Sequence, residues 1–174
     1  MEEFMKPRHD RYLKLRPLPP TPEDEICACT SVLPVLLQPH LSANPLSCAR
    51  CNLEVPPDRI GFDGALADAL ASWRQFHDSF FFLWLDSGEF EEWAKKHLSD
   101  PLSVVNTRGL DLASRVNNFR RCYLWWFQDE GADDWVPASK CPRCKAVLEL
   151  RFKGERPQGG SLVVCDQCSI AVAV

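Results

Sequence analysis

Two Cys-x-x-Cys pairs near the C-terminus constrain this chain more than any other feature. Cys141 and Cys144 form the first pair, and Cys165 and Cys168 form the second after twenty intervening residues. Pairs at this spacing are typical of a zinc ribbon, in which each pair sits on a tight turn and the chain between them forms a β-hairpin. The sequence therefore predicts a C-terminal zinc-ribbon β-hairpin over residues 138–174, with one structural Zn²⁺ held by these four thiolates.

The residues around the two pairs support a hairpin independently of the cysteines. Apolar and polar side chains alternate over residues 146–153, which predicts a half-buried strand. A segment rich in turn-forming residues follows at 154–160, and residues 170–174 alternate again, which predicts a third strand. Because so small a unit buries little apolar surface, we expect zinc binding to contribute to its folding free energy.

Disulfides and a redox dithiol are the alternative interpretations of the C-terminal pairs. Disulfides require an oxidising compartment, whereas residues 1–10 carry no apolar signal-peptide core, so we expect a cytoplasmic protein. A redox Cys-x-x-Cys normally occurs once, where a strand meets a helix. This chain has two such pairs, each beside a strand pattern, and zinc is therefore the favoured ligand.

The N-terminal third carries four more cysteines. Cys27 and Cys29 form a Cys-x-Cys pair, and Cys48 and Cys51 form a Cys-x-x-Cys pair eighteen residues later. These thiols predict a second four-thiolate zinc site, with His40 as a substitute ligand if one cysteine points away. The alternative is a set of buried free thiols, because unpaired cysteine is among the most buried residue types. The expected cofactor content is accordingly one Zn²⁺, or two if this site also binds.

Composition and periodicity indicate an α+β protein of ordinary globular character. Charged residues make up 25% of the chain and hydrophobic residues 45%. Many of its fourteen prolines lie in the first sixty residues, so an irregular β segment is predicted over 1–60. Within it, residues 11–16 read as a strand, and Pro34 makes residues 31–37 an edge strand or a bulge.

A helical middle is predicted over residues 61–130. Apolar side chains recur at three and four residues from 63 to about 79, again from Glu89, and a third time in the segment before the aromatic strand at 122–127. The run Phe80-Phe-Phe-Leu-Trp-Leu85 is too apolar to be exposed, so it is expected as a buried strand or as a continuation of the first helix.

The order of these motifs resembles a bacterial family of unknown function. The resemblance spans roughly residues 25–174 and rests on the segment 45–56, the segment 100–110, the aromatic run 123–127 and the two C-terminal pairs. That family is described as zinc-ribbon-containing and nucleic-acid-binding, so the resemblance implies a zinc ribbon at the C-terminal cysteines. A weaker resemblance connects the chain to myxobacterial proteins with two distant Cys-x-x-Cys-Gly motifs, some of them linked to toxin immunity.

The chain departs from the ribbon pattern after each C-terminal pair. A glycine often follows the second cysteine of the turn, where the backbone is left-handed, but here Lys145 and Ser169 stand instead. The zinc ligands are unaffected by this departure. The departure leaves the geometry of the turn open.

Nucleic-acid binding is the first functional hypothesis. The candidate contacts to phosphate are Arg143, Arg151, Lys153 and Arg156, on or near the outer face of the ribbon strand. The expected partner is RNA or single-stranded DNA, since such sites pair cations with aromatic rings. The net charge of −4 argues against a protein that coats nucleic acid by charge alone.

A protein-interaction adaptor or a toxin-immunity-type protein is the alternative function. An enzyme is not expected, because no catalytic arrangement of Ser, His and Asp is visible and a four-thiolate zinc has no open position for water. A non-enzymatic protein is not expected to have a small-molecule substrate. No membrane partner is expected, since no run of eighteen apolar residues occurs.

Overall fold

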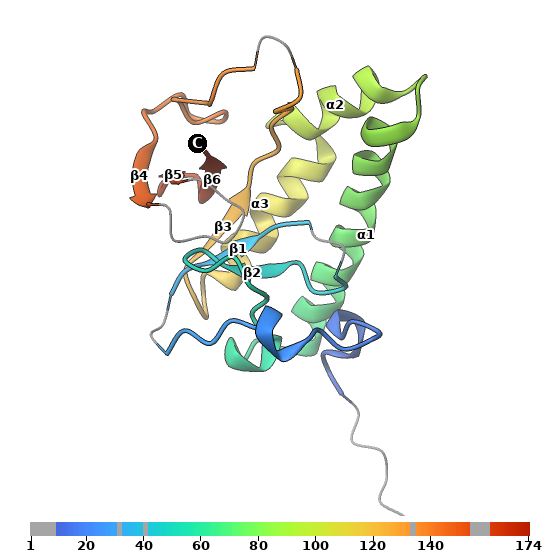
Figure 1. Cartoon of the computed structure of the whole chain (residues 1–174), viewed down its shortest axis with the longest axis vertical. Helices are drawn as coiled ribbons and strands as arrows, with labels where there is room; N and C mark the ends of the chain where they lie inside the picture. The colour runs from blue at the N-terminus through green and yellow to red at the C-terminus, as the bar shows by residue number, and fades with distance from the viewer. Residues whose placement is uncertain (1–9, 31–32, 40–41, 133–134, 154–160) are drawn as a thin grey trace, which may run out of the picture.

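The structure is a computed structural model that describes residues 10–30, 33–39, 42–132, 135–153 and 161–174. Its fold is α+β, as predicted, with one six-stranded sheet and three α-helices (Figure 1). The elements in chain order are η1 (Leu13–Leu15), η2 (Glu23–Glu25), β1 (Val35–Leu37), β2 (Leu46–Cys48), η3 (Pro57–Arg59), α1 (Gly64–Asp86), α2 (Glu91–Ser99), α3 (Val104–Val116), β3 (Cys122–Trp125), β4 (Glu149–Phe152), β5 (Leu162–Cys165) and β6 (Ile170–Ala173).

The sheet joins strands from distant parts of the chain in the order β2-β1-β3-β6-β5-β4. Its centre is parallel, because β3 pairs in parallel with both β1 and β6, while the outer pairs β1–β2, β5–β6 and β4–β5 are antiparallel. The predicted segments 1–60, 61–130 and 138–174 therefore all contribute strands to one sheet. That three-part division stays a prediction.

Alternation along the central strands sends side chains to two different cores. The larger core, between the sheet and the helices, receives from the sheet Val35, Leu37, Cys122, Leu124, Ile170 and Val172. A smaller core on the opposite face receives Leu36, Tyr123 and Ala171. Both faces of the sheet centre are thus covered, which is why these strands are apolar at nearly every position.

The helix α3 packs against β3 at the sheet centre, and α1 packs against α3. Asp63 caps α1 by accepting a hydrogen bond from the backbone of Leu66, at 2.7 Å. The indole Nε1 of Trp73 donates to the carbonyl oxygen of Val105 at 2.9 Å, which ties α1 to α3. Gly109 permits this proximity, because a Cβ there would lie 3.0 Å from the side chain of Leu124.

Three local expectations from the sequence are wrong in detail. Residues 11–16 form no strand, since Leu13–Leu15 is a short 3-10 helix. Pro34 does not place its strand at an edge, because it precedes β1, which pairs on both sides. The run Phe80–Leu85 continues α1, which confirms the helical alternative, but its side chains are half-buried or exposed and not buried as expected. None of the helices in the described ranges combines the length and the apolar character that crossing a bilayer requires.

Candidate metal centres

The four C-terminal cysteines converge from the turn after Lys140 and from the turn between β5 and β6. Their Sγ atoms all lie within 4.8 Å of one another. The Sγ atoms of Cys144 and Cys165 are 3.6 Å apart. A tetrahedral Zn²⁺ with Zn–S bonds of about 2.3 Å places its sulfurs about 3.8 Å apart. The four thiols can therefore hold one metal ion with little rearrangement.

The four N-terminal cysteines form a second cluster of the same dimensions. Cys27, Cys29, Cys48 and Cys51 also have their Sγ atoms within 4.8 Å of one another. His40 lies outside the described residues, and four thiols are present without it. The sequence left open whether these thiols gather or lie apart, and the structure brings them together. Both groups can hold zinc or another metal.

The Cys-x-Cys arm of this second cluster is placed by backbone contacts rather than by a turn of its own. The backbone N–H of Cys27 donates to the carbonyl oxygen of Glu54 at 2.8 Å, beside the Cys48–Cys51 turn. The guanidinium of Arg59 donates to the carbonyl oxygens of Cys27 and Cys29. This pairing carries Cys27 and Cys29 to the second pair across the eighteen residues between them.

Every Cys-x-x-Cys turn ends in the same unusual backbone conformation. Across the described ranges, only three residues other than glycine have a positive φ: Asn52 at 59°, Lys145 at 65° and Ser169 at 54°. Each directly follows the second cysteine of a pair. A left-handed conformation costs a non-glycine residue roughly 1–2 kcal/mol, although asparagine tolerates it better. The turns thus keep the geometry that usually takes glycine, without glycine.

Backbone hydrogen bonds close two of these turns in the same way. The N–H of Asn52 donates to the carbonyl oxygen of Cys48 at 2.8 Å, and the N–H of Lys145 donates to that of Cys141 at 3.0 Å. The bond runs in each case from the residue after the pair to its first cysteine. An N-terminal and a C-terminal turn therefore share one local structure.

The thiols within a cluster do not titrate alike. The backbone N–H of Ala146 donates to Cys144 and lowers the pKa of its thiol to about 7. Burial works against ionisation of Cys27, but hydrogen bonds from the backbone of Cys29 and from neighbouring thiols lower its pKa overall. Burial is the main cause of raised pKa values at Cys48, Cys51, Cys165 and Cys168. Deprotonating all four thiols of a cluster therefore requires a cation between them.

Asp166, inside the second C-terminal turn, connects this cluster to the sheet. Its carboxylate accepts a hydrogen bond from the hydroxyl of Tyr123 at 2.6 Å and ion pairs from Arg121 and Arg151. The guanidinium of Arg121 lies over the Tyr123 ring, 4.5 Å from its centroid. The hydrogen bond from Tyr123, with the two guanidinium groups, lowers the pKa of Asp166. The turn is thereby fixed to β3 and β4.

The four predicted phosphate contacts differ in their surroundings. Arg143 and Lys153 are exposed on the surface. Arg151 is also exposed, but its guanidinium forms ion pairs with Glu149 and Asp166. Arg156 lies outside the described residues. Pairing with two carboxylates offsets the charge of Arg151, so its role at a phosphate stays a prediction.

A cationic groove of about 470 Å³ lies between the Cys48–Cys51 turn and β4. It is lined by Leu33, Arg50, Leu150, Arg151, Phe152 and Lys153. Arg50 comes from the first Cys-x-x-Cys turn, and the other cations come from β4 and its end. Sequence reasoning missed Arg50 because it is a hundred residues away from Arg151. The available signal was its place before the second cysteine, which Arg143 shares.

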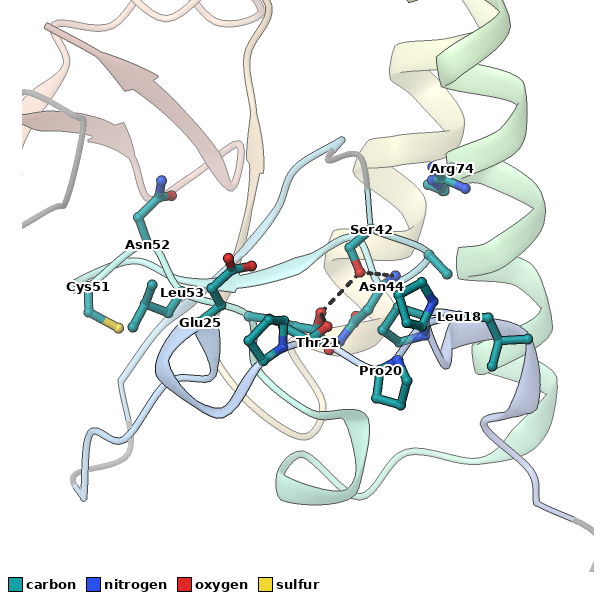
Figure 2. A pocket seen from close by; sticks show the side chains of 15 residues that line it. Leu18, Pro20, Thr21, Glu25, Ser42, Asn44, Cys51, Asn52, Leu53 and Arg74 are labelled. Carbon is teal, nitrogen blue, oxygen red and sulfur yellow. Dashed lines mark hydrogen bonds between the residues drawn. The ribbon is translucent and has the colours of Figure 1, made fainter.

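A larger cavity of about 860 Å³ lies along the proline-rich stretch and reaches Cys51 (Figure 2). Glu54 on its wall accepts hydrogen bonds from Thr21 at 2.6 Å, Ser42 at 3.0 Å and Asn44 at 3.1 Å. These neutral donors occupy both carboxylate oxygens. Glu54 therefore fastens the proline-rich stretch to the loop before β2.

No family model, no curated protein and no solved structure matches this chain. The family resemblance read from the motifs consequently stays a prediction. The function has to be inferred from the chain's own geometry.

Proposed function

We propose that the chain is a non-enzymatic protein that holds two structural Zn²⁺ ions, one in each cysteine cluster. The observation that carries this proposal is the left-handed exit of all three Cys-x-x-Cys turns at residues other than glycine. Such strain persists only where the surrounding structure over-determines it. Four sulfurs gathered around one ion supply that constraint.

The donor set favours zinc among the metals and favours a structural role for it. Soft thiolates suit zinc, whereas magnesium and calcium prefer oxygen ligands. Four cysteines fill a tetrahedral ion and leave no position for a reacting water. Neither cluster therefore offers a metal-activated nucleophile, which is why the proposal is non-enzymatic.

Elemental analysis of protein purified without chelators tests the stoichiometry. We expect two zinc ions per chain, and one after either Cys48→Ser or Cys144→Ser, because each change removes one ligand set. Ala49→Ser is a matched control, since it adds a hydroxyl inside the first turn and should retain both ions. Full-length protein that contains no zinc, or that keeps two ions in both cysteine variants, would refute the proposal.

We further propose that the cationic groove binds single-stranded nucleic acid. Arg50 and Lys153 would contact phosphates, and the half-buried ring of Phe152 would stack on a base. The groove supports this function because it gathers cations and an aromatic ring in a chain whose net charge is −4. With so few phosphate contacts, affinity should be modest and should fall steeply with salt.

Titration of fluorescent single-stranded RNA and DNA at two salt concentrations tests the groove. We expect Arg50→Glu combined with Lys153→Glu to weaken binding at least tenfold at low salt. The control combines Lys96→Glu with Lys140→Glu, which changes the net charge equally at two exposed positions away from the groove. Equal binding by both variants, or native affinity weaker than roughly 10⁻⁴ M, would reject nucleic-acid binding in favour of the protein-interaction adaptor.

A further inference from the structure

The C-terminal part of α1 is apolar although it is only partly covered: Phe82 and Leu85 are exposed and the other four side chains of 80–85 are half-buried. The buried residues of α1 end at His77, although the helix continues to Asp86. The six residues from Phe80 to Leu85 are all apolar or aromatic. A helix that is hydrophobic on every side is normally enclosed by its own protein. Here the hairpin formed by the end of α1 and the start of α2 lies apart from the sheet (Figure 1).

Four large apolar side chains of this hairpin tip, residues 80–93, face solvent. Phe82 and Leu85 are each 54% exposed, and Phe90 and Trp93 are each 49% exposed. Scattered apolar side chains need no explanation, but a cluster of large ones marks an interaction site. The tip thus carries apolar surface that the described chain does not cover.

Contacts within the hairpin hold this surface in shape. The rings of Phe80 and Trp93 stack with centroids 5.4 Å apart, which fixes α1 against α2. In the connecting turn, the backbone N–H of Phe90 donates to the hydroxyl of Ser87, and that of Gly88 donates to the carboxylate of Glu91. A pre-formed surface loses little conformational entropy on binding.

The tip is also acidic. Residues 79–94 contain four carboxylates, at Asp86, Glu89, Glu91 and Glu92, and Lys95, Lys96 and His97 follow directly. Among the described residues, no ion pair involves any of the four, whereas Asp78 pairs with Arg74 of the same helix, and Lys95 pairs with Asp129 in the segment after β3. The apolar tip therefore carries a net negative charge.

We propose that the hairpin tip is a docking surface for a basic segment of another protein, one that carries lysine or arginine together with a large apolar side chain. The apolar anchor would pack against Phe82 and Leu85, which lie on the face of α1 opposite the Phe80–Trp93 stack, and the cations would pair with the surrounding carboxylates. Charge complementarity selects this occupant. Nucleic acid is disfavoured by the carboxylates, and a second copy would bring like charges together. This site is separate from the cationic groove.

Selection of a random 12-residue peptide library on the native protein tests this surface. We expect the enriched peptides to be basic and to contain aromatic or aliphatic residues. Their binding, measured by fluorescence anisotropy, should weaken at least tenfold in Phe82→Ser/Leu85→Ser and in Glu89→Lys/Glu92→Lys. These side chains are exposed, so the variants should fold, and circular dichroism verifies that they do.

Two matched controls separate the tip from general surface effects. Leu18→Ser/Val136→Ser removes apolar groups that are 91% and 76% exposed elsewhere, and Glu23→Lys/Asp24→Lys makes the same charge change in η2. Both should bind like the native protein. The proposal is overturned if no peptide is enriched, if the enriched peptides are not basic, or if the tip variants bind like the controls. A native dimer that Phe82→Ser/Leu85→Ser dissociates in sedimentation would assign the surface to a second copy and also overturn it.

Discussion

The two cysteine clusters offer a metal the same four thiols, but the chain shields them differently. In the N-terminal cluster, Cys27 and Cys48 are buried, and Cys29 and Cys51 are half-buried. In the C-terminal cluster, Cys144 is exposed. The cluster with the less diagnostic spacing is thus the better protected one. The spacing of two cysteines indicates how easily a turn directs both thiols at one metal. The protection of the thiols from solvent depends instead on the residues that pack around them.

The turns of the two clusters also tolerate their left-handed exits differently. The N-terminal turn ends at Asn52, a residue type that visits this conformation readily. The C-terminal turns end at Lys145 and Ser169, for which the left-handed conformation costs more free energy. The C-terminal cluster is therefore both more open and more strained. Four measurements test this contrast.

Removing one ligand from each cluster should give the largest difference. Cys48 ends β2 and is 1% exposed in the main core, so Cys48→Ser leaves a polar group and three thiols without their ion there. We expect it to lower the free energy of unfolding by more than about 4 kcal/mol, in the range seen when a metal is lost. Cys144→Ser should cost less and should loosen mainly β4 and β5, leaving the helices folded.

Urea unfolding followed by helical circular dichroism measures the cost of Cys48→Ser, and amide hydrogen exchange of β4 and β5 measures the loosening in Cys144→Ser. Ser47→Ala is a control for a small change on the same strand away from the metal. Equal destabilisation by Cys48→Ser and Cys144→Ser would show that burial does not distinguish the clusters.

Acid should unfold the helical core through a group that belongs to neither cluster. Burial between the rings of Trp73 and Phe81 lowers the pKa of His77 to about 4, against an ordinary value of 6.5. Between pH 6.5 and pH 4 the imidazole of His77 is protonated in the unfolded chain and neutral in the folded one. The free energy of unfolding is therefore retained above pH 6.5 and falls as the pH drops toward 4. The loss is roughly 3 kcal/mol over the full window.

His77→Leu should remove this contribution without leaving a buried polar group. Urea unfolding between pH 6.5 and 4.5 measures the slope, and the charge-transfer absorption of Co²⁺-substituted protein reports each cluster. In the native protein we expect both clusters to lose metal together with the helices. In His77→Leu the exposed C-terminal cluster should lose its metal at the higher pH. Identical slopes in the two proteins would contradict the role of His77.

Chelators should distinguish the clusters kinetically at neutral pH. A chromogenic chelator reaches the exposed thiolate of Cys144 directly, whereas the N-terminal cluster has to open first, so release should show two phases that differ by about tenfold in rate. The fast phase should be absent from Cys144→Ser and present in Cys51→Ser. A single phase in the native protein would mean that the two clusters exchange alike.

Glycine at the turn exits should produce the smallest effect. Lys145→Gly and Ser169→Gly relieve the left-handed strain and should each raise the free energy of unfolding by about 0.5–1 kcal/mol, after the entropic cost of glycine. Asn52→Gly should change it by less. Thermal unfolding measures the differences, with Lys140→Gly as a control. An equal gain at all three exits would show that strain does not separate the clusters.

Local patterns in the sequence predicted a large part of the local structure. The Cys-x-x-Cys spacing predicted turns, and the structure has them, each followed by a residue in the left-handed conformation. The alternation at 146–153 and 170–174 predicted strands, which the structure places at Glu149–Phe152 and Ile170–Ala173. The burial of Phe80–Leu85 was predicted wrongly, because composition indicates how apolar a segment is but not which parts of the chain cover it.

The elements whose cause is local could be predicted from the sequence: the cysteine turns, the strand alternation and the periodicity of the helices. Which of these elements meet depends on the tertiary structure. It placed β3 between β1 and β6, brought Cys27 and Cys29 to the turn at Cys48, and set Arg50 beside β4. Turn geometry and side-chain period depend on residues that are a few positions apart. Strand order, burial and the convergence of ligands depend instead on contacts between distant segments, and no periodic signal in the sequence reports such contacts.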